Sequence, residues 1–403
     1  AGPLFPLSFV VGAIVTTFSA YSYIKMSNAW PSSGGIAMIL QKAYGPGSIA
    51  AAASLLMAFS MVINESLVAR TFATYALRPL GLQSHWLLVP TLGLGVIIFA
   101  DLVNASGNRS VSLVSLLMSG LKIGGITLFG VAALIAGGFG GAALAEPVIE
   151  VRPVDFVASA ALSILAFKGF TTITNSGADI VDPHRNVGRT IMIAIAICVV
   201  TYLLVAIAVG SSLSLDEIIQ ARDYSLAAAA RPTIGDYGFY LTIALAIVAT
   251  SSGVVASVFA VSRMLTMLTE MKMIPHSHFG MSGPIRRHML VYTVVIAGSL
   301  TVLFDLSRIA SLGAFFYLMM DMMVHWGVFR RLRHEIGASA WILLTALGLD
   351  AVVLTAFTVI KYRSDPSIVF YAALGISSVF IFERFYLSVL RDKLKTEPNM
   401  DDS

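Results

Sequence analysis

Two lysines lie within long apolar runs, where a charged side chain is unusual. Lys122 stands in the run Ser-Gly-Leu-Lys-Ile-Gly-Gly, and Lys168 stands between Phe167 and Gly169. A buried ammonium group loses its charge more readily than an exposed one and can carry a proton, and in its charged form it can hold an anionic group. Proton transfer and recognition of a carboxylate are therefore the chemistry that these two positions indicate.

The residues after Lys168 predict an interruption of a helix. Gly169 is followed by Thr171, Thr172 and Asn175, whose side chains compete for backbone hydrogen bonds. Opened backbone inside a membrane is tolerated only where it lines a cavity or is buried in protein, and discontinuous helices of secondary transporters meet a small ligand. The expected substrate-binding segment consists of Leu165, Ala166, Phe167, Lys168, Gly169 and Phe170.

The composition places the whole chain in the membrane class. Its 403 residues are 57% hydrophobic and only 12% charged, whereas a soluble domain carries about 25% charged residues. Many apolar runs reach the ~20 residues that a helix needs to cross hydrocarbon. The lipid bilayer is therefore an expected partner and nucleic acid is not. The single Cys198 excludes an internal disulfide.

Eleven membrane spans are expected in a single domain, residues 1–403. The spans are residues 5–29, 48–76, 85–101, 111–137, 156–178, 190–212, 237–268, 289–304, 307–329, 339–360 and 366–390. If the N-terminus lies outside, 16 of the 26 lysines and arginines fall on the inner side and 8 on the outer side, as the positive-inside rule requires. We therefore expect a multi-pass protein of the cell (plasma) membrane whose C-terminal tail, residues 391–403, is cytoplasmic.

Three segments carry a resemblance to a known family. Residues 163–189 resemble the sixth helix and following loop of the amino acid–polyamine–organocation (APC) superfamily transporters, although Asp179 replaces the usual Glu and Gly188 the usual Pro. Residues 31–45 resemble the motif that ends the second helix of that family. Residues 261–275 resemble the end of its eighth helix. The three landmarks occur in the family's order and at its spacing.

The resemblance implies an all-α polytopic protein with the LeuT-like five-plus-five inverted-repeat fold. Residues 1–330 would form the core repeats, and residues 331–390 would add two peripheral helices. The family typically has twelve spans, and the expected spans here lack its first helix, which normally supplies half of the substrate site. An incomplete sequence and a real eleven-span protein both remain open at this point.

The resemblance also implies a proton-coupling site. In proton-coupled members, a lysine on the fifth helix stands where sodium sits in sodium-coupled relatives, and Lys122 matches that position. Ser251 and Ser252, on a later helix, are expected to supply its interaction partners. The alternative is that Lys122 extends its ammonium group to the inner membrane interface.

Other ionisable residues within spans are weighed as candidates for a gate or relay. Lys168 attracts a substrate carboxylate, pairs with Glu65, or points away from the site; these alternatives stay open. Glu65 needs a partner near mid-membrane. Asp321 and His325 are four residues apart on one helix face, and their place toward the cytoplasmic end favours an inner gate or solvation at the interface over a relay. For Asp350 we expect only an interhelical hydrogen bond.

The function expected from these features is secondary active transport of an amino acid, by proton-coupled symport. The alternatives are exchange of an amino acid for its amine product and a non-transporting membrane subunit or sensor. An enzyme is not expected, since no nucleophile–base pair or metal cluster is visible, and the spacing of His276 and His278 does not predict a metal site. No cofactor is expected beyond the proton as coupling ion, and no oligomeric state is predicted.

Overall fold

The computed structural model describes residues 2–32, 34–106, 108–137, 143, 152–221, 223–274 and 284–396. Within these residues every regular element is a helix, which confirms the prediction of an all-α protein. The long helices are α1 (Phe5–Ala29), α3 (Ser48–Leu77), α4 (Leu88–Ala105), α5 (Asn108–Gly137), α6 (Pro153–Phe167), α8 (Pro183–Ser212), α10 (Ser225–Glu270), α11 (Ile285–Leu303), α12 (Leu306–Gly327), α13 (Ala340–Ser364) and α14 (Pro366–Thr396). The short α-helices are α2 (Gly35–Tyr44), α7 (Thr171–Thr174) and α9 (Leu215–Gln220).

The long helices coincide with the predicted spans. In the part of the chain that the structure describes, ten helical segments are long and apolar enough to cross a membrane, with α6 and α7 counted as one segment. The remaining predicted span coincides with α11, which has 19 residues. Its first turn holds Arg286, Arg287 and His288, which lower its mean hydropathy.

α10 is longer than the span predicted for it because it joins two helices across a kink. Gly235 has a φ of 75°, a left-handed conformation that glycine adopts without the steric cost of a Cβ. The predicted span, residues 237–268, is the part after this kink. The part before it, residues 225–234, continues the connection that contains α9.

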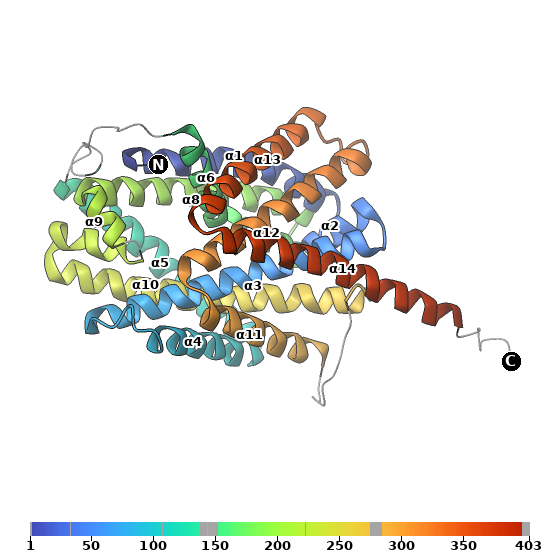
Figure 1. Cartoon of the computed structure of the whole chain (residues 1–403), viewed down its shortest axis with the longest axis horizontal. Coiled ribbons are helices and arrows are strands. Elements are labelled where there is room, and N and C mark those ends of the chain that lie inside the picture. The colour runs from blue at the N-terminus through green and yellow to red at the C-terminus, as the bar shows by residue number, and fades with distance from the viewer. Residues whose placement is uncertain are drawn as a thin grey trace.

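α3 forms the centre of the bundle. It packs against α4, α10, α11, α12 and α14, and Figure 1 shows it between the layer with α1 and α13 and the layer with α4 and α11. Ala50, Ala51, Ala52 and Ala53 on this helix are fully buried. Small residues let helix backbones approach closely where no hydrophobic effect drives association in lipid, so this run suits a central membrane helix.

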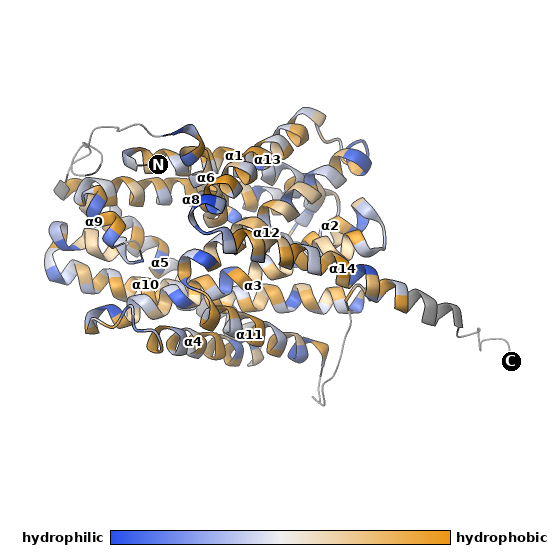
Figure 2. Cartoon of the chain, in the orientation of Figure 1, coloured by the Kyte–Doolittle hydropathy of each residue, from blue (hydrophilic) through white to orange (hydrophobic). Residues whose placement is uncertain are grey.

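The outer surface of the bundle is apolar. Figure 2 shows hydrophobic residues along the outer helices, and large side chains such as Leu128 on α5, Val200 on α8 and Phe385 on α14 are exposed. Large exposed apolar faces are unusual on soluble monomers but are expected where lipid contacts the protein. The polar groups that do chemistry must therefore lie inside the bundle.

Candidate functional site

The helix that carries Lys168 is interrupted at this residue. A single 3₁₀ turn lies between the end of α6 and the start of α7. The Thr171 hydroxyl donates to the carbonyl of Lys168 at 2.8 Å. The Thr172 hydroxyl donates to the carbonyl of Gly169 at the same distance, 2.8 Å. The predicted interruption is confirmed, and these hydrogen bonds are the competition for backbone carbonyls that the threonines indicated.

The ammonium group of Lys168 is buried against α3. It donates to the Ser60 carbonyl at 2.7 Å and to the Ser60 hydroxyl at 2.9 Å, and it lies 5.8 Å from the centroid of the Tyr317 ring on α12. A pair with Glu65 is not formed. Ser60 and Glu65 are five residues apart on α3, which turns their side chains about 140° away from each other. Lys168 therefore ties the interrupted helix to α3 without a carboxylate.

Glu65 is a separate buried group. Its side chain is fully buried, and neither carboxylate oxygen has a hydrogen-bond partner among the described residues. A buried charge without a partner is costly, so a carboxyl group in this position is suited to holding a proton. Its role as gate or relay stays a prediction.

The predicted substrate-binding segment has buried and exposed members. Phe167 and Phe170 are buried, as are the neighbouring Leu165 and Lys168, whereas Ala166 and Gly169 are exposed. The Phe170 ring lies edge-on to Tyr23 of α1, with centroids 5.4 Å apart. The open side of the turn is therefore formed by the two small residues.

Gly169 marks the free space beside the turn. No atom lies within 4 Å of the position that a Cβ would take at this residue. The carbonyl of the nearby Ala166 accepts a hydrogen bond at 3.0 Å from the hydroxyl of Tyr202 on α8. Tyr202 also packs against Phe167, with ring centroids 5.1 Å apart. Tyr202 could not be predicted from the sequence, because it lies in an otherwise apolar helix, 36 residues from its partner.

The predicted coupling residues are not joined by hydrogen bonds. Lys122 is partly buried on α5 and forms no hydrogen bond or ion pair with any described residue; Cys198 of α8 is close enough to interact with it electrostatically. The Ser251 hydroxyl donates to the carbonyl of Ile247 on its own helix at 2.7 Å. Ser252 is buried nearby on α10. α5 and α10 pack together, but the expected contact between the lysine and the serines is absent from the described residues.

Three segments that are far apart in the sequence meet next to the interrupted helix. Arg263 of α10 and Asp179, which follows α7, form an ion pair with Nη1 and Oδ2 2.8 Å apart. Gly35 at the start of α2 lies against Asn175, and a Cβ at this glycine would collide with the Asn175 side-chain oxygen. The φ of Gly35 is +46°, which also favours glycine. The three sequence landmarks are thus neighbours in space.

Comparison with known proteins agrees with this arrangement. A model of the amino acid permease family matches residues 1–382. The chain belongs to this family.

Two relatives are similar over much of the permease. The inner membrane transport protein YbaT of Escherichia coli (strain K12) is 27% identical over 358 residues, which are 87% of this chain and 81% of the relative. The uncharacterized protein MJ0609 of Methanocaldococcus jannaschii (strain ATCC 43067 / DSM 2661 / JAL-1 / JCM 10045 / NBRC 100440) is 30% identical over 272 residues, 64% of this chain and 59% of the relative. With the apolar helices, these findings identify the permease as a multi-pass membrane transport protein.

Asp321 of the permease lies in a buried polar cluster between α1 and α12. Its carboxylate accepts hydrogen bonds from the hydroxyls of Tyr23, at 2.5 Å, and Ser19, at 2.6 Å. The side chain is fully buried, which contradicts the alternative of solvation at the membrane interface, while a role as gate or relay stays a prediction. Because Tyr23 packs on Phe170, the cluster touches the interrupted helix.

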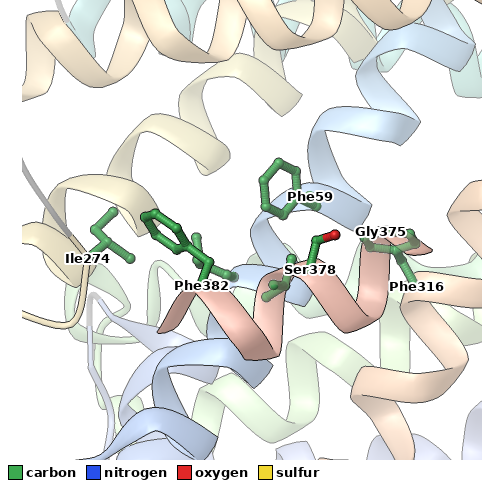
Figure 3. A pocket seen from close by; sticks show the side chains of 8 residues that line it. Phe59, Ile274, Phe316, Gly375, Ser378 and Phe382 are labelled. Carbon is green, nitrogen blue, oxygen red and sulfur yellow. The ribbon is translucent and has the colours of Figure 1, made fainter. Parts of the chain in front are cut away.

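An apolar groove lies on another side of the permease, between α3, α12 and α14 (Figure 3). It has a volume of about 550 Å³, and Phe59, Phe316 and Phe382 are among its lining side chains. Among the described residues, Ser378 is the one polar side chain that lines it. A zwitterionic substrate needs several polar groups to replace its hydration, so this groove does not suit an amino acid.

Proposed function

We propose that this permease takes up an amino acid together with a proton. The observation that carries the proposal is the interrupted helix at residues 168–170, which has free space beside Gly169. A discontinuous membrane helix offers backbone groups and helix ends to a small charged ligand. Membership of the amino acid permease family supports the substrate class.

In this proposal the substrate's amino group binds backbone carbonyls of the substrate-binding segment. Ala166 and Gly169 are its exposed members, and Tyr202 orients the carbonyl of Ala166. Lys168 holds the turn from behind, because its ammonium group is tied to Ser60. A rigid turn reduces the conformational freedom that substrate binding would otherwise have to remove.

The proposed fold is the five-plus-five inverted repeat of LeuT-like transporters. Its core is residues 1–330, and α13 and α14 are peripheral helices. Transport then follows from rocking one group of helices against another around the interrupted helix. The charge of the loops supports a cytoplasmic C-terminus in the cell membrane.

Lys122 is the proposed proton carrier. A carrier must gain and lose its charge within each transport cycle, and this side chain has no hydrogen-bond or ion-pair partner among the described residues. Lys168 has two oxygen acceptors on Ser60 and is better suited to a fixed structural position. Ser251 and Ser252 are proposed to meet Lys122 in another conformation of the cycle.

Uptake of labelled amino acids into proteoliposomes tests the proposed function. We expect at least one amino acid to accumulate when an inward proton gradient is imposed, and the accumulation to stop when a protonophore dissipates the gradient. Accumulation that needs an amine inside the vesicles and ignores the gradient would identify an exchanger instead. Absence of any substrate-dependent uptake or exchange across the amino acid panel would contradict transport by this protein.

A further inference from the structure

Three side chains of α12 and α13 converge in the interior of the bundle. Asp321, His325 and Asp350 are all fully buried. The Nε2 atom of His325 lies 3.5 Å from Oδ1 of Asp321 and 3.4 Å from Oδ2 of Asp350. One candidate ligand atom from each residue lies within 4.8 Å of the other two. The cluster is outside the substrate-binding segment, and the proposed proton coupling through Lys122 does not use it.

The surrounding hydrogen bonds orient Asp321 and His325, but polar atoms of His325 and Asp350 that face each other have no hydrogen-bond partner among the described residues. Tyr23 and Ser19 hold the carboxylate of Asp321. The Ser22 hydroxyl lies 2.7 Å from Nδ1 of His325 and so fixes the ring. Nε2 of the same histidine has no hydrogen-bond partner among the described residues.

Asp350 is the least satisfied member of the cluster. Neither of its oxygens has a hydrogen-bond partner among the described residues, so the expected interhelical hydrogen bond is replaced by a longer ion-pair contact with His325 of α12. Its carboxylate is aimed at His325 but stays 3.4 Å away. A buried polar group without a partner costs about 1–3 kcal/mol, and a charged one more. Both oxygens of Asp350 are therefore available as ligands.

The buried charge of the cluster can be balanced by a protonated His325 or by a bound metal ion. Two carboxylates are buried within a few ångströms of each other, and no lysine or arginine of the described chain forms an ion pair with them. Lys168 lies over the Tyr317 ring and donates to Ser60, not to these carboxylates. Buried charges are normally paired or coordinate a metal ion.

The separations from His325 are longer than direct hydrogen bonds and are compatible with a shared metal ion. An N–H···O hydrogen bond spans about 2.7–3.2 Å between nitrogen and oxygen, which is shorter than both separations from His325. Two ligands that are each about 2.1 Å from one ion at a tetrahedral angle lie about 3.4 Å apart. The observed separations of 3.5 and 3.4 Å fit the second geometry.

We propose that Asp321, His325 and Asp350 bind one divalent transition-metal ion. Two carboxylates and a neutral imidazole balance a charge of +2. Calcium needs six to eight oxygen ligands and magnesium retains several waters, so neither suits a fully buried site with one nitrogen ligand. Tyr23 and Ser22 supply the outer hydrogen bonds that orient metal ligands. The ion links α13 to α12 and, through these outer hydrogen bonds, to α1.

Metal analysis of the purified protein tests the site. The permease is purified through a tag without histidine, incubated with Zn²⁺, dialysed, and analysed by mass spectrometry of metals. About one Zn²⁺ per chain is expected, and Asp350→Asn and His325→Gln should lower the bound amount at least tenfold. Glu383→Gln is the matched control, because Glu383 on α14 is also a fully buried carboxyl without a hydrogen-bond partner. This control should keep its metal.

A spectroscopic measurement on the unaltered permease covers the case in which the variants do not fold. With Co²⁺ in place of Zn²⁺, X-ray absorption should show nitrogen and oxygen ligands at about 2.0–2.2 Å. Asp350→His should retain Co²⁺ with a changed visible spectrum. Equal metal in the unaltered permease, Asp350→Asn and His325→Gln would show adventitious binding and overturn the site. Absence of bound Zn²⁺ and Co²⁺ from the unaltered permease would overturn it as well, and leave protons as the cations of the cluster.

Discussion

Nη1 of Arg263 and Oδ2 of Asp179 lie 2.8 Å apart and join the end of α10 to the loop after α7. The two residues are 84 positions apart in the sequence. Because α7 continues the interrupted helix, this ion pair connects the candidate substrate site to a helix that packs on α3 and α5. A contact in this place is suited to closing one side of the site.

Arg263→Ala is expected to slow transport without unfolding the protein. The side chains of Arg263 and Asp179 are 23% and 59% exposed, and an ion pair of this exposure contributes only about 0–1 kcal/mol to the free energy of unfolding. Uptake should fall severalfold while the unfolding temperature changes little. The double variant with Arg263→Asp and Asp179→Arg should regain part of the rate. Arg152→Ala, which breaks an exposed local pair with Asp155, is the control and should leave uptake unchanged. Wild-type uptake by Arg263→Ala would contradict a role in closure.

Gly169→Leu is expected to abolish substrate binding in a folded protein. A side chain at this position enters free space, so it blocks the proposed site without clashing with the core. Gly169→Ala should bind more weakly but measurably. Gly35→Ala is the contrasting control. The backbone at this position has a positive φ, and an added Cβ would collide with Asn175, so the substitution should destabilise the fold by about 1–2 kcal/mol or more. Binding measured by substrate-induced thermal stabilisation separates these outcomes, and unchanged affinity in Gly169→Leu would place the substrate elsewhere.

The proposed orientation predicts which residues can be labelled from each side. In a Cys198→Ser background, Gln220→Cys should react with an impermeant thiol reagent from outside the cell. His184→Cys and His334→Cys should react only after the membrane is opened. All three side chains are exposed on loops or helix ends, so access depends on the side of the membrane and not on burial. The reverse labelling pattern would invert the topology.

Asp365, between α13 and α14, should make stability depend on pH. A hydrogen bond from Ser367, at 2.5 Å, and one from Arg308, at 2.8 Å, hold the pKa of Asp365 below its usual value. A carboxyl group with a lowered pKa in the folded state stabilises the protein above its unfolded pKa of about 3.9 and loses this contribution as the pH falls through the folded value. The unfolding temperature of Asp365→Asn should therefore lie below that of the wild type at pH 7, and the gap should shrink below about pH 4. A gap that does not change with pH would exclude this linkage.

Local chemistry made the interruption at Lys168 predictable, since glycine and threonine act on the backbone next to them. Hydropathy likewise located the helices, because each membrane span must be apolar along its own length. Partners across helices could not be read in this way. Ser60 reaches Lys168 from 108 positions away, and Asp350 reaches His325 from another helix. Such contacts depend on the rotation of packed helices, which hydropathy does not determine.

Proton coupling through Lys122 can be decided by one transport measurement. The protein as its gene encodes it is reconstituted into proteoliposomes, and uptake is compared with and without an inward proton gradient. Lys168→Met serves as the comparison, and it should change affinity or substrate preference while accumulation still responds to the gradient. Lys122→Ala should lose gradient-driven accumulation, although exchange of labelled for unlabelled substrate survives. If Lys122→Ala accumulates substrate in response to the gradient as the wild type does, Lys122 is not the coupling residue.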